Sequence, residues 1–220
     1  MTEPAAAIPP DLADTLRTWV RAWTISRELD PPLAHGSGWR VDVGLPEQRR
    51  RHVFPEIGDD LRALGAHEHE PWCYIKCLAP VDALRAALPA RWSVQPQSAM
   101  MVFEGEAPAG EALPAGYALD VPADARVPHV RIRAADGGLA ADGRLVMMGD
   151  VAIIDRIGTD AAHRRRGLGA AVMRALHAIA RERGARRGLL VATQQGQALY
   201  ETLGWRVIAP YASAVVAAEA

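Results

Sequence analysis

The segment from Ile157 to Ala170 combines the residue types that bind phosphate groups. It reads Ile-Gly-Thr-Asp-Ala-Ala-His-Arg-Arg-Arg-Gly-Leu-Gly-Ala, and it separates an extended apolar stretch from one with helical periodicity. The first N–H groups of a helix lack intrahelical partners, and the helix dipole is positive at that end. Glycine lets the backbone approach a ligand closely, and arginine forms charge-assisted hydrogen bonds with phosphate. The segment therefore predicts a site for a pyrophosphate group.

The spacing of the glycines excludes two common phosphate-binding motifs. The chain has no G-x-x-x-x-G-K-[ST] sequence, which excludes a P-loop. Gly167-Leu168-Gly169 lacks the third glycine of the dinucleotide-binding fingerprint. The predicted ligand is therefore a pyrophosphate compound of another class.

The elements around this segment predict an α/β or α+β fold. The apolar stripe that begins at Leu168 predicts a long helix, with Gly184 where a C-cap belongs. Period-two or short apolar segments predict strands at 117–121, 129–134, 139–147, 151–157 and 189–192. A helix at 194–203 and a closing hairpin of 205–209 with 213–217 complete this half.

The N-terminal half predicts a separate mixed unit, residues 1–104, joined to residues 117–220 by a linker or surface loop. Residues 105–116 are almost entirely Gly, Pro, Ala and Glu, a composition typical of such loops. The pattern before them predicts helices at 11–29 and 81–88, a hairpin at 39–54, and strands at 72–78 and 99–103. Three tryptophans here, Trp39, Trp72 and Trp92, fit either a core or the lining of an acceptor pocket.

Two motifs in the C-terminal half together resemble those of a known family. Arg164, Gly167 and Gly169 match the acyl-CoA-binding pattern [QR]-x-x-G-x-[GA], and residues 197–205 are similar to A-x-x-L-Y-x-x-x-G-[FW]. They occur in the expected order, about thirty residues apart. Over residues 117–220 the chain thus resembles the GNAT superfamily of N-acetyltransferases. The resemblance implies a mixed, largely antiparallel central sheet flanked by helices.

The resemblance also implies how acetyl-CoA, the co-substrate, would bind. Backbone groups of Ile157, Gly158 and Thr159 would pair with the pantetheine arm, and Thr193 stands where the family often has a cofactor-binding asparagine. The strands 151–157 and 189–193 would splay apart around the acyl group. The N–H groups that would hold the pyrophosphate belong to Arg164, Arg165, Arg166, Gly167, Leu168, Gly169 and Ala170.

The same resemblance implies direct attack of a primary amine on the thioester in a ternary complex. Tyr200 matches the tyrosine that protonates the departing thiolate, although it also fits a core position. Asp155 is the predicted general base, and the alternative role is that of a cross-strand partner for an arginine. No helix is predicted between Tyr117 and His129, where the family has two that line the acceptor site. The N-terminal unit is therefore expected to contribute to binding the acceptor, a small-molecule or peptide amine.

Composition limits the other function classes. The formal charge of −1 argues against an extended nucleic-acid surface, although residues 156–187 hold nine arginines against Asp160 and Glu182, a local balance of +7. No signal segment or run of eighteen apolar residues occurs, so a cytoplasmic protein without membrane contact is expected. Lys76 is the only lysine, a bias typical of a high-GC bacterial genome. A homodimer is compatible with such a fold.

No metal is expected from the cluster of His67, Glu68, His69 and Glu70 with Cys73 and Cys77, because its spacing matches no common zinc pattern. The cysteines fit core packing better. The sequence thus predicts an acetyl-CoA-dependent N-acetyltransferase. The alternatives are a non-catalytic acyl-CoA-sensing module and a nucleic-acid-binding protein that uses the arginines.

Overall fold

The computed structural model describes residues 10–105, 112–121 and 125–217. The chain forms two compact units. The first unit contains the residues up to Thr24, Glu28–Ala99 and the chain from Ala209 onward; the second unit contains Ile25–Arg27 and Met100–Ile208. The strands β6 (Ser98–Phe103) and β12 (Arg206–Val216) contribute residues to both.

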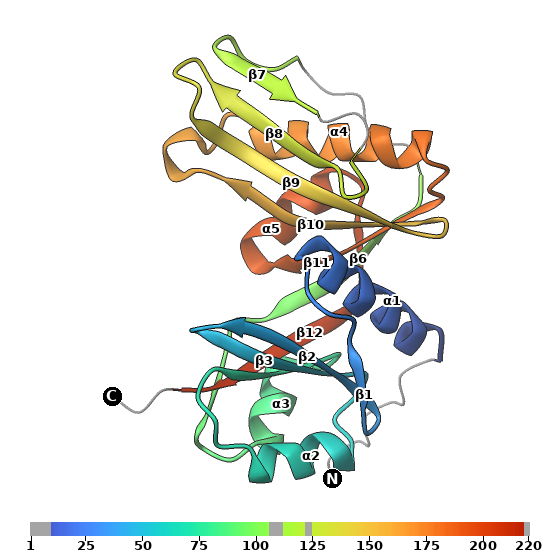
Figure 1. The fold of residues 1–220 in the computed structure, drawn as a ribbon, viewed down its shortest axis with the longest axis vertical. Helices are drawn as coiled ribbons and strands as arrows, with labels where there is room; N and C mark the ends of the chain where they lie inside the picture. Colours follow the sequence, from blue (N-terminus) through green and yellow to red (C-terminus); the bar gives the residue numbers. More distant parts are fainter. Residues whose placement is uncertain (1–9, 106–111, 122–124, 218–220) are drawn as a thin grey trace. The chain divides into compact units, whose positions relative to one another are not determined.

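The first unit is a mixed sheet with helices on it (Figure 1). Its strands follow the order β1 (Leu33–His35), β2 (Gly38–Leu45), β3 (Gln48–Phe54), β4 (Cys73–Cys77) and β12, and β5 (Trp92–Val94) also pairs with β12. On one face, α2 (Asp59–His67) and α3 (Val81–Ala87) bury Leu61 and Leu84 against Phe54 and Ile75. Helix α1 (Pro10–Ser26) packs Trp19 against Tyr211, with ring centroids 5.5 Å apart.

The second unit contains the predicted phosphate-binding segment. β7 (Tyr117–Asp120), β8 (His129–Ala134), β9 (Leu139–Met148) and β10 (Val151–Thr159) are antiparallel neighbours, and β11 (Arg187–Thr193) runs parallel to β10. A 3₁₀ turn, η1 (Ala161–His163), leads to α4 (Leu168–Glu182), and α5 (Gln194–Thr202) follows β11. The predicted class, a mixed and largely antiparallel sheet with helices, is confirmed.

Helix α4 packs closely on the sheet because β9 has a glycine beneath it. A Cβ atom added to Gly143 would lie 2.3 Å from Ile157 Cδ1 and 2.8 Å from Val172 Cγ1. The side of β9 that carries Gly143 therefore faces α4. Since side chains alternate along a strand, Asp142 and Arg144 point to the opposite face.

Several predicted elements differ from the structure. The predicted closing hairpin is wrong: β12 is one continuous strand through Pro210, and it pairs antiparallel with both β4 and β5. Pro210 is exposed, and Ala212 to Val215 pair with β4. Helix α2 and strands β1 and β5 were not predicted. The compact units divide at Ala99/Met100 and place residues 209–220 with the first unit, and residues 106–111 of the predicted linker lie outside the described residues.

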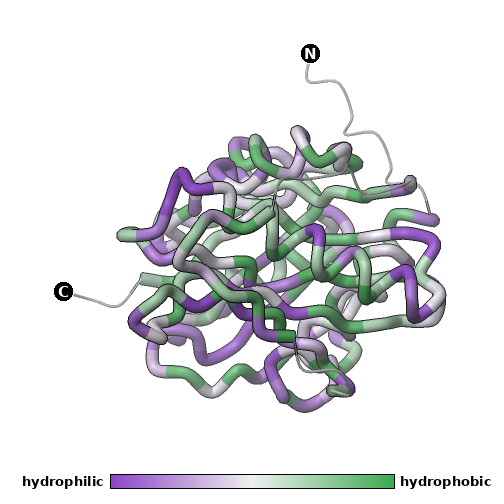
Figure 2. Tube along the Cα trace, turned by 90° about the horizontal axis from the view of Figure 1, so that it is seen from above, coloured by the Kyte–Doolittle hydropathy of each residue, from purple (hydrophilic) through white to green (hydrophobic). Residues whose placement is uncertain are grey.

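No described helix is both long enough and apolar enough to cross a membrane. Along the trace in Figure 2, hydrophobic and hydrophilic residues alternate over short distances, as amphipathic strands and helices require.

A buried histidine, His177, lies on α4 in the second unit. Its ring lies 4.5 Å from that of Phe103 and 5.5 Å from that of Trp205, and Nε2 is buried without a hydrogen-bond partner among the described residues. Burial lowers the pKa of His177 from 6.5 to about 4. Between these values the unfolded chain binds more protons than the folded one, so stability falls as the pH falls.

We expect His177 alone to lower the free energy of unfolding by about 2 kcal/mol at pH 5 relative to neutral pH. Thermal melts of the wild type and of His177→Phe between pH 7 and 5 measure it. The melting temperature of the variant should fall less than that of the wild type over this range. Parallel curves would contradict the assignment.

Candidate active site

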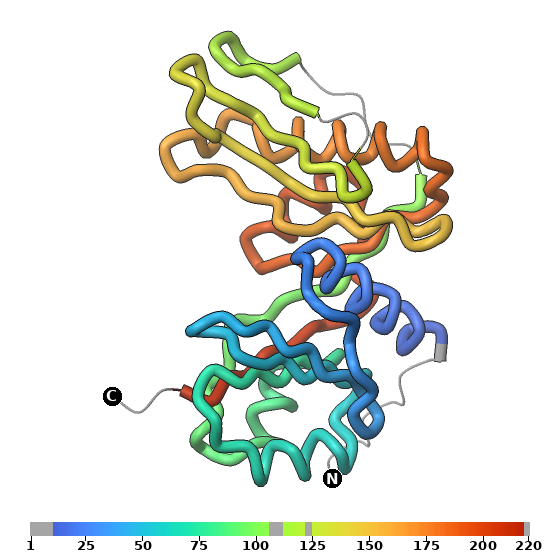
Figure 3. Tube along the Cα trace, in the orientation of Figure 1, coloured from blue at the N-terminus to red at the C-terminus, as the bar shows by residue number. Residues whose placement is uncertain are grey.

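The turn from β10 into α4, whose path can be followed along the trace in Figure 3, begins a helix whose first backbone N–H groups have no intrahelical acceptor. Arg165 and Gly167, the N-cap of α4, both adopt left-handed backbone conformations, with φ of +62° and +74°. The N–H of Ala171 donates to the carbonyl of Gly167 at 3.0 Å, which is the first bond of the helix. The N–H groups of Leu168, Gly169 and Ala170 therefore have no intrahelical acceptor and face the turn.

This helix start is electropositive. Arg164, Arg165 and Arg166 are exposed, and the first turn of α4 contains no acidic residue. Arg166 Nη1 donates to the hydroxyl of Tyr117 at 3.0 Å, and that hydroxyl lies 2.9 Å from His163 Nδ1. Tyr117, the first residue of β7, is therefore hydrogen-bonded to two residues of the turn. The arrangement suits a polyanionic ligand such as pyrophosphate.

The strands β10 and β11 part next to this turn. Their parallel pairing runs only from Val151↔Arg187 to Ile153↔Leu189, whereas β10 pairs with β9 as far as Thr159. A register shift between Asp155 and Gly158, with Arg156 at φ +56°, bends β10 where the strands part. The backbone from Ile154 to Thr159 therefore has an unpaired edge toward β11. Ile157, Gly158 and Thr159, predicted to bind pantetheine, lie on this edge.

Tyr200 lies on α5 beside this opening and is 8% exposed. Its ring packs over Gly196, where an added Cβ would lie 3.1 Å from Tyr200 Cε2. Burial, with a smaller contribution from the nearby Asp155 carboxylate, raises the pKa of Tyr200 to about 12. The phenol therefore keeps its proton throughout the neutral range and can donate it.

Asp155 is held by two groups from the segment 25–27, which belongs to the second unit. Its Oδ2 accepts a hydrogen bond from Ser26 Oγ at 2.7 Å and forms an ion pair with Arg27 Nη1. Burial lowers the pKa of Arg27, although the ion pair opposes this effect. Sequence analysis left a cross-strand arginine open as the partner of Asp155. The residue across the strands is Arg144, but the ion pair is formed by Arg27, which follows α1. Nothing in the local pattern could identify it, because the two residues are 128 positions apart.

Two predicted cofactor-binding residues have structural roles as well. The side chain of Thr193 caps α5 by accepting from the N–H of Gly196 at 3.2 Å. The side chain of Leu168 is 1% exposed, so only its backbone is available to a ligand at the turn. The Thr193 hydroxyl accepts the capping bond and still has its own proton to donate, and the backbone N–H of Leu168 stays available, so both predicted contacts remain compatible with these roles.

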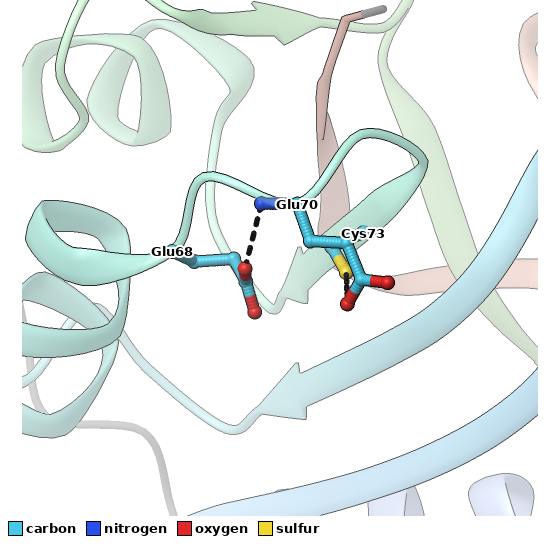
Figure 4. Close-up of side chains that lie close together, drawn as sticks. All are labelled: Glu68, Glu70 and Cys73. Atoms are coloured by element: carbon cyan, nitrogen blue, oxygen red, sulfur yellow. Dashed lines mark hydrogen bonds between the residues drawn. The ribbon is translucent and has the colours of Figure 1, made fainter.

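A cluster of Glu68, Glu70 and Cys73 lies in the first unit (Figure 4). Their ligand atoms lie within 4.8 Å of one another. Arg50 pairs with both carboxylates, at 3.5 and 3.3 Å, and Arg49 pairs with Glu70 at 2.9 Å. Burial raises the pKa of the Cys73 thiol to about 12, so the thiol stays protonated. The charges of this cluster are thus already balanced by arginines.

The first unit repeats the order of elements around the phosphate-binding turn. In both units an antiparallel pair, β2–β3 or β9–β10, leads to a helix, a parallel strand and a second helix. Two features differ. β3 and β4 stay paired from Arg50↔Cys73 to Phe54↔Cys77, the last residue of each strand, and the first turn of α2 carries Asp59 and Asp60. Paired strands and an acidic helix start leave this equivalent position unsuited to a phosphate group.

Comparison with known families agrees with the geometry of the second unit. The sequence profile described as "Acetyltransferase (GNAT) family" matches residues 82–205, more than half of the chain. The chain belongs to the GNAT acetyltransferase family. The match begins before residue 117, where the motif-based resemblance began, and so includes part of the N-terminal half. No curated protein matches the sequence.

Solved structures extend the GNAT similarity over nearly the whole chain. A GCN5-related N-acetyltransferase from Kribbella flavida is 17% identical, with a TM-score of 0.65 and 98% of each chain covered. An acetyltransferase of the GNAT family from Novosphingobium aromaticivorans is 19% identical, with a TM-score of 0.58 and coverage of 93% of this chain and 97% of that one. A GCN5-related N-acetyltransferase from Sphaerobacter thermophilus has 12% identity, a TM-score of 0.58 and coverage of 97% and 96%. At these identities the similarity establishes the fold, and it includes the first unit.

Proposed function

We propose that this GNAT protein transfers the acetyl group of acetyl-CoA to a primary amine by direct attack in a ternary complex. One observation carries the proposal: the opening between β10 and β11 adjoins the electropositive start of α4. A ligand that spans both positions needs a polyanionic end and an extended arm that can pair with a strand. Coenzyme A has both.

The residues at the turn fit such a ligand. The N–H groups of Arg164–Ala170 would hold the pyrophosphate, and the edge of β10 at Ile157, Gly158 and Thr159 would pair with the pantetheine arm. The hydroxyl of Thr193 would add a contact near α5. Acetyl-CoA supplies an activated thioester, whose carbonyl carbon bonds to the amine nitrogen as the carbon–sulfur bond breaks.

Tyr200 and Asp155 would handle the two protons. The neutral phenol of Tyr200 would protonate the departing thiolate. Asp155 would take the proton of the amine through Oδ1, since Ser26 and Arg27 both contact Oδ2. The two residues are close enough for the charge of Asp155 to affect the pKa of Tyr200.

The substitution Asp155→Asn distinguishes two roles of Asp155, that of a general base and that of a structural partner of Arg27. We expect kcat to fall at least about a hundredfold, because the amide cannot accept the proton while its shape preserves packing. A lower melting temperature with kcat unchanged would assign Asp155 to holding Arg27 alone.

The proposed function is tested by calorimetry with CoA and by thiol release from acetyl-CoA over an amine panel. We expect one CoA to bind per chain, because the turn into α2 lacks the features of the turn into α4. We also expect thiol release that depends on the amine. Tight CoA binding without turnover on any amine would favour a sensing module instead. Retention on immobilised DNA or RNA at high salt, without CoA binding, would favour a nucleic-acid-binding role.

A further inference from the structure

Asp155 and Arg144 lie on the face of the second unit's sheet that points away from α4, and two further arginines, Arg27 and Arg156, lie near them. Arg144 is the Cα partner of Asp155 across β9 and β10, so the two side chains share this face. Arg27 forms the ion pair with Asp155, and Arg156 follows it at the bend of β10. We call Arg27, Arg144 and Arg156 the arginine cluster.

The positive charge of the arginine cluster exceeds the negative charge of the carboxylates that pair with it in the described part of the chain. Arg144 Nη1 donates a hydrogen bond to the backbone carbonyl of Ser26 at 2.6 Å. This contact does not neutralise the positive charge of Arg144, because the carbonyl is uncharged. Arg156 is exposed. Over the described residues, neither Arg144 nor Arg156 forms an ion pair with a carboxylate. Among the residues that the structure describes, Asp155 is thus the one carboxylate seen to pair with this cluster, through Arg27, and the charges of Arg144 and Arg156 are left without an ion pair.

The other carboxylates on this face do not supply the missing charge. Asp142 lies 2.8 Å from His129 Nε2, and Arg131 in turn contacts His129 Nδ1 at 2.8 Å. Asp120 pairs with Arg131 at 3.9 Å and with Arg133 at 4.0 Å. These groups balance one another. An anion that approaches Asp155 would therefore meet a net positive charge.

We propose that the amine acetylated by this protein carries a carboxylate or phosphate group near its nitrogen, and that Arg144 and Arg156 bind this group. The inference rests on the proposed function and names the substrate class for the same site. A guanidinium fork matches both oxyanions in geometry, and Asp155 lies close enough to draw the amino group of the same molecule. Polycationic amines would be repelled by the same cluster.

Matched pairs of amines test the proposal. The pairs are phenylalanine with phenylalaninamide and O-phosphoethanolamine with ethanolamine, and spermidine serves as the polycation. Thiol release from acetyl-CoA gives kcat/KM for each. We expect at least one anionic member to exceed its neutral partner about tenfold or more, a difference of about 1.4 kcal/mol. A preference for phenylalanine over phenylalaninamide alone would identify the recognised group as a carboxylate. A preference for O-phosphoethanolamine over ethanolamine alone would identify it as a phosphate.

Variants assign the preference to the cluster. Arg156→Asn removes the charge at an exposed position, and asparagine tolerates the left-handed backbone there, so the fold is expected to be retained. It should lower the ratio within the pair several-fold, and addition of Arg144→Gln should bring the ratio to within about twofold. Arg186→Gln, an exposed arginine elsewhere in the second unit, should leave the ratio unchanged.

The outcomes separate this inference from the proposed function. Equal or better use of neutral amines or spermidine by the wild type would overturn the substrate class while acetyl transfer stands. A preference that survives in the double variant would overturn the role of the cluster. CoA binding without thiol release on any amine would overturn the proposed function, and this inference with it.

Discussion

Replacing Gly169 by valine is expected to abolish CoA binding. Gly169 lies in the first turn of α4, where an added Cβ would be 3.1 Å from Leu199 Cδ2 and 3.6 Å from Thr159 Oγ1. An alanine would require Leu199 to move by a few tenths of an ångström. The two methyl groups of valine would enter the space between the end of β10 and α5, and would displace the N–H groups that face the turn. We expect the Kd for CoA to rise at least about a hundredfold, equivalent to about 2.7 kcal/mol, measured by calorimetry.

Two other glycines of the same helix provide matched controls. Gly167, the N-cap, and Gly184, beyond the C-terminus, both have positive φ, +74° and +83°, and both have open space around an added Cβ. Alanine at either position imposes a similar backbone strain of about 1 kcal/mol. Gly167→Ala should weaken CoA binding, whereas Gly184→Ala should lower only the melting temperature. Unchanged CoA affinity in Gly169→Val, with the fold intact, would contradict the pyrophosphate site.

The donor side could be predicted from the sequence because its determinants are local. The turn from Ile157 to Ala170 depends on glycines at fixed offsets and on consecutive arginines, and α4 has an apolar stripe that repeats over several turns. Such features act over about ten residues and survive a change of tertiary surroundings. The left-handed conformation of Gly167 is of this kind. That of Arg165 is not, because arginine has no preference for it.

The elements that were missed depend on distant contacts. Helix α2 has nine residues and buries only Leu61 and Gly65, so its pattern is too short to identify a helix. In β12, Pro210 suggests a turn. The strand nevertheless continues, because it pairs with β4, whose residues come more than 130 positions earlier in the chain. Pairing over such a separation is invisible to local periodicity.

The environment of Asp155 could not be predicted for the same reason. Its partner Ser26 is the last residue of α1 and its partner Arg27 follows directly, in a part of the chain with no recognisable motif. Their contact with β10 depends on the path of the chain after α1, where Glu28 adopts a positive φ of +57°. The expectation that the N-terminal half contributes to the acceptor side stays a prediction, and the segment 25–27 is where we would test it first.

Replacing Tyr200 by phenylalanine is expected to lower kcat by a factor of about 10²–10⁴ while the Kd for CoA changes little. The ring of Tyr200 packs over Gly196 and lies 6.3 Å from that of Trp205, contacts that phenylalanine preserves. Only the proton that would reach the thiolate is lost. Because the pKa of Tyr200 is raised to about 12, wild-type kcat should show no loss from ionisation of this phenol between pH 7 and 9.

Tyr211 provides the control for a buried tyrosine outside the proposed site. It is 3% exposed in the first unit, and its hydroxyl has no hydrogen-bond partner among the described residues. Tyr211→Phe should therefore leave kcat unchanged and alter stability little, since it removes a buried hydroxyl without breaking a bond. If Tyr200→Phe matched Tyr211→Phe in retaining full kcat, Tyr200 would be a packing residue. The departing thiolate would then take its proton from another donor, such as water in the opening between β10 and β11.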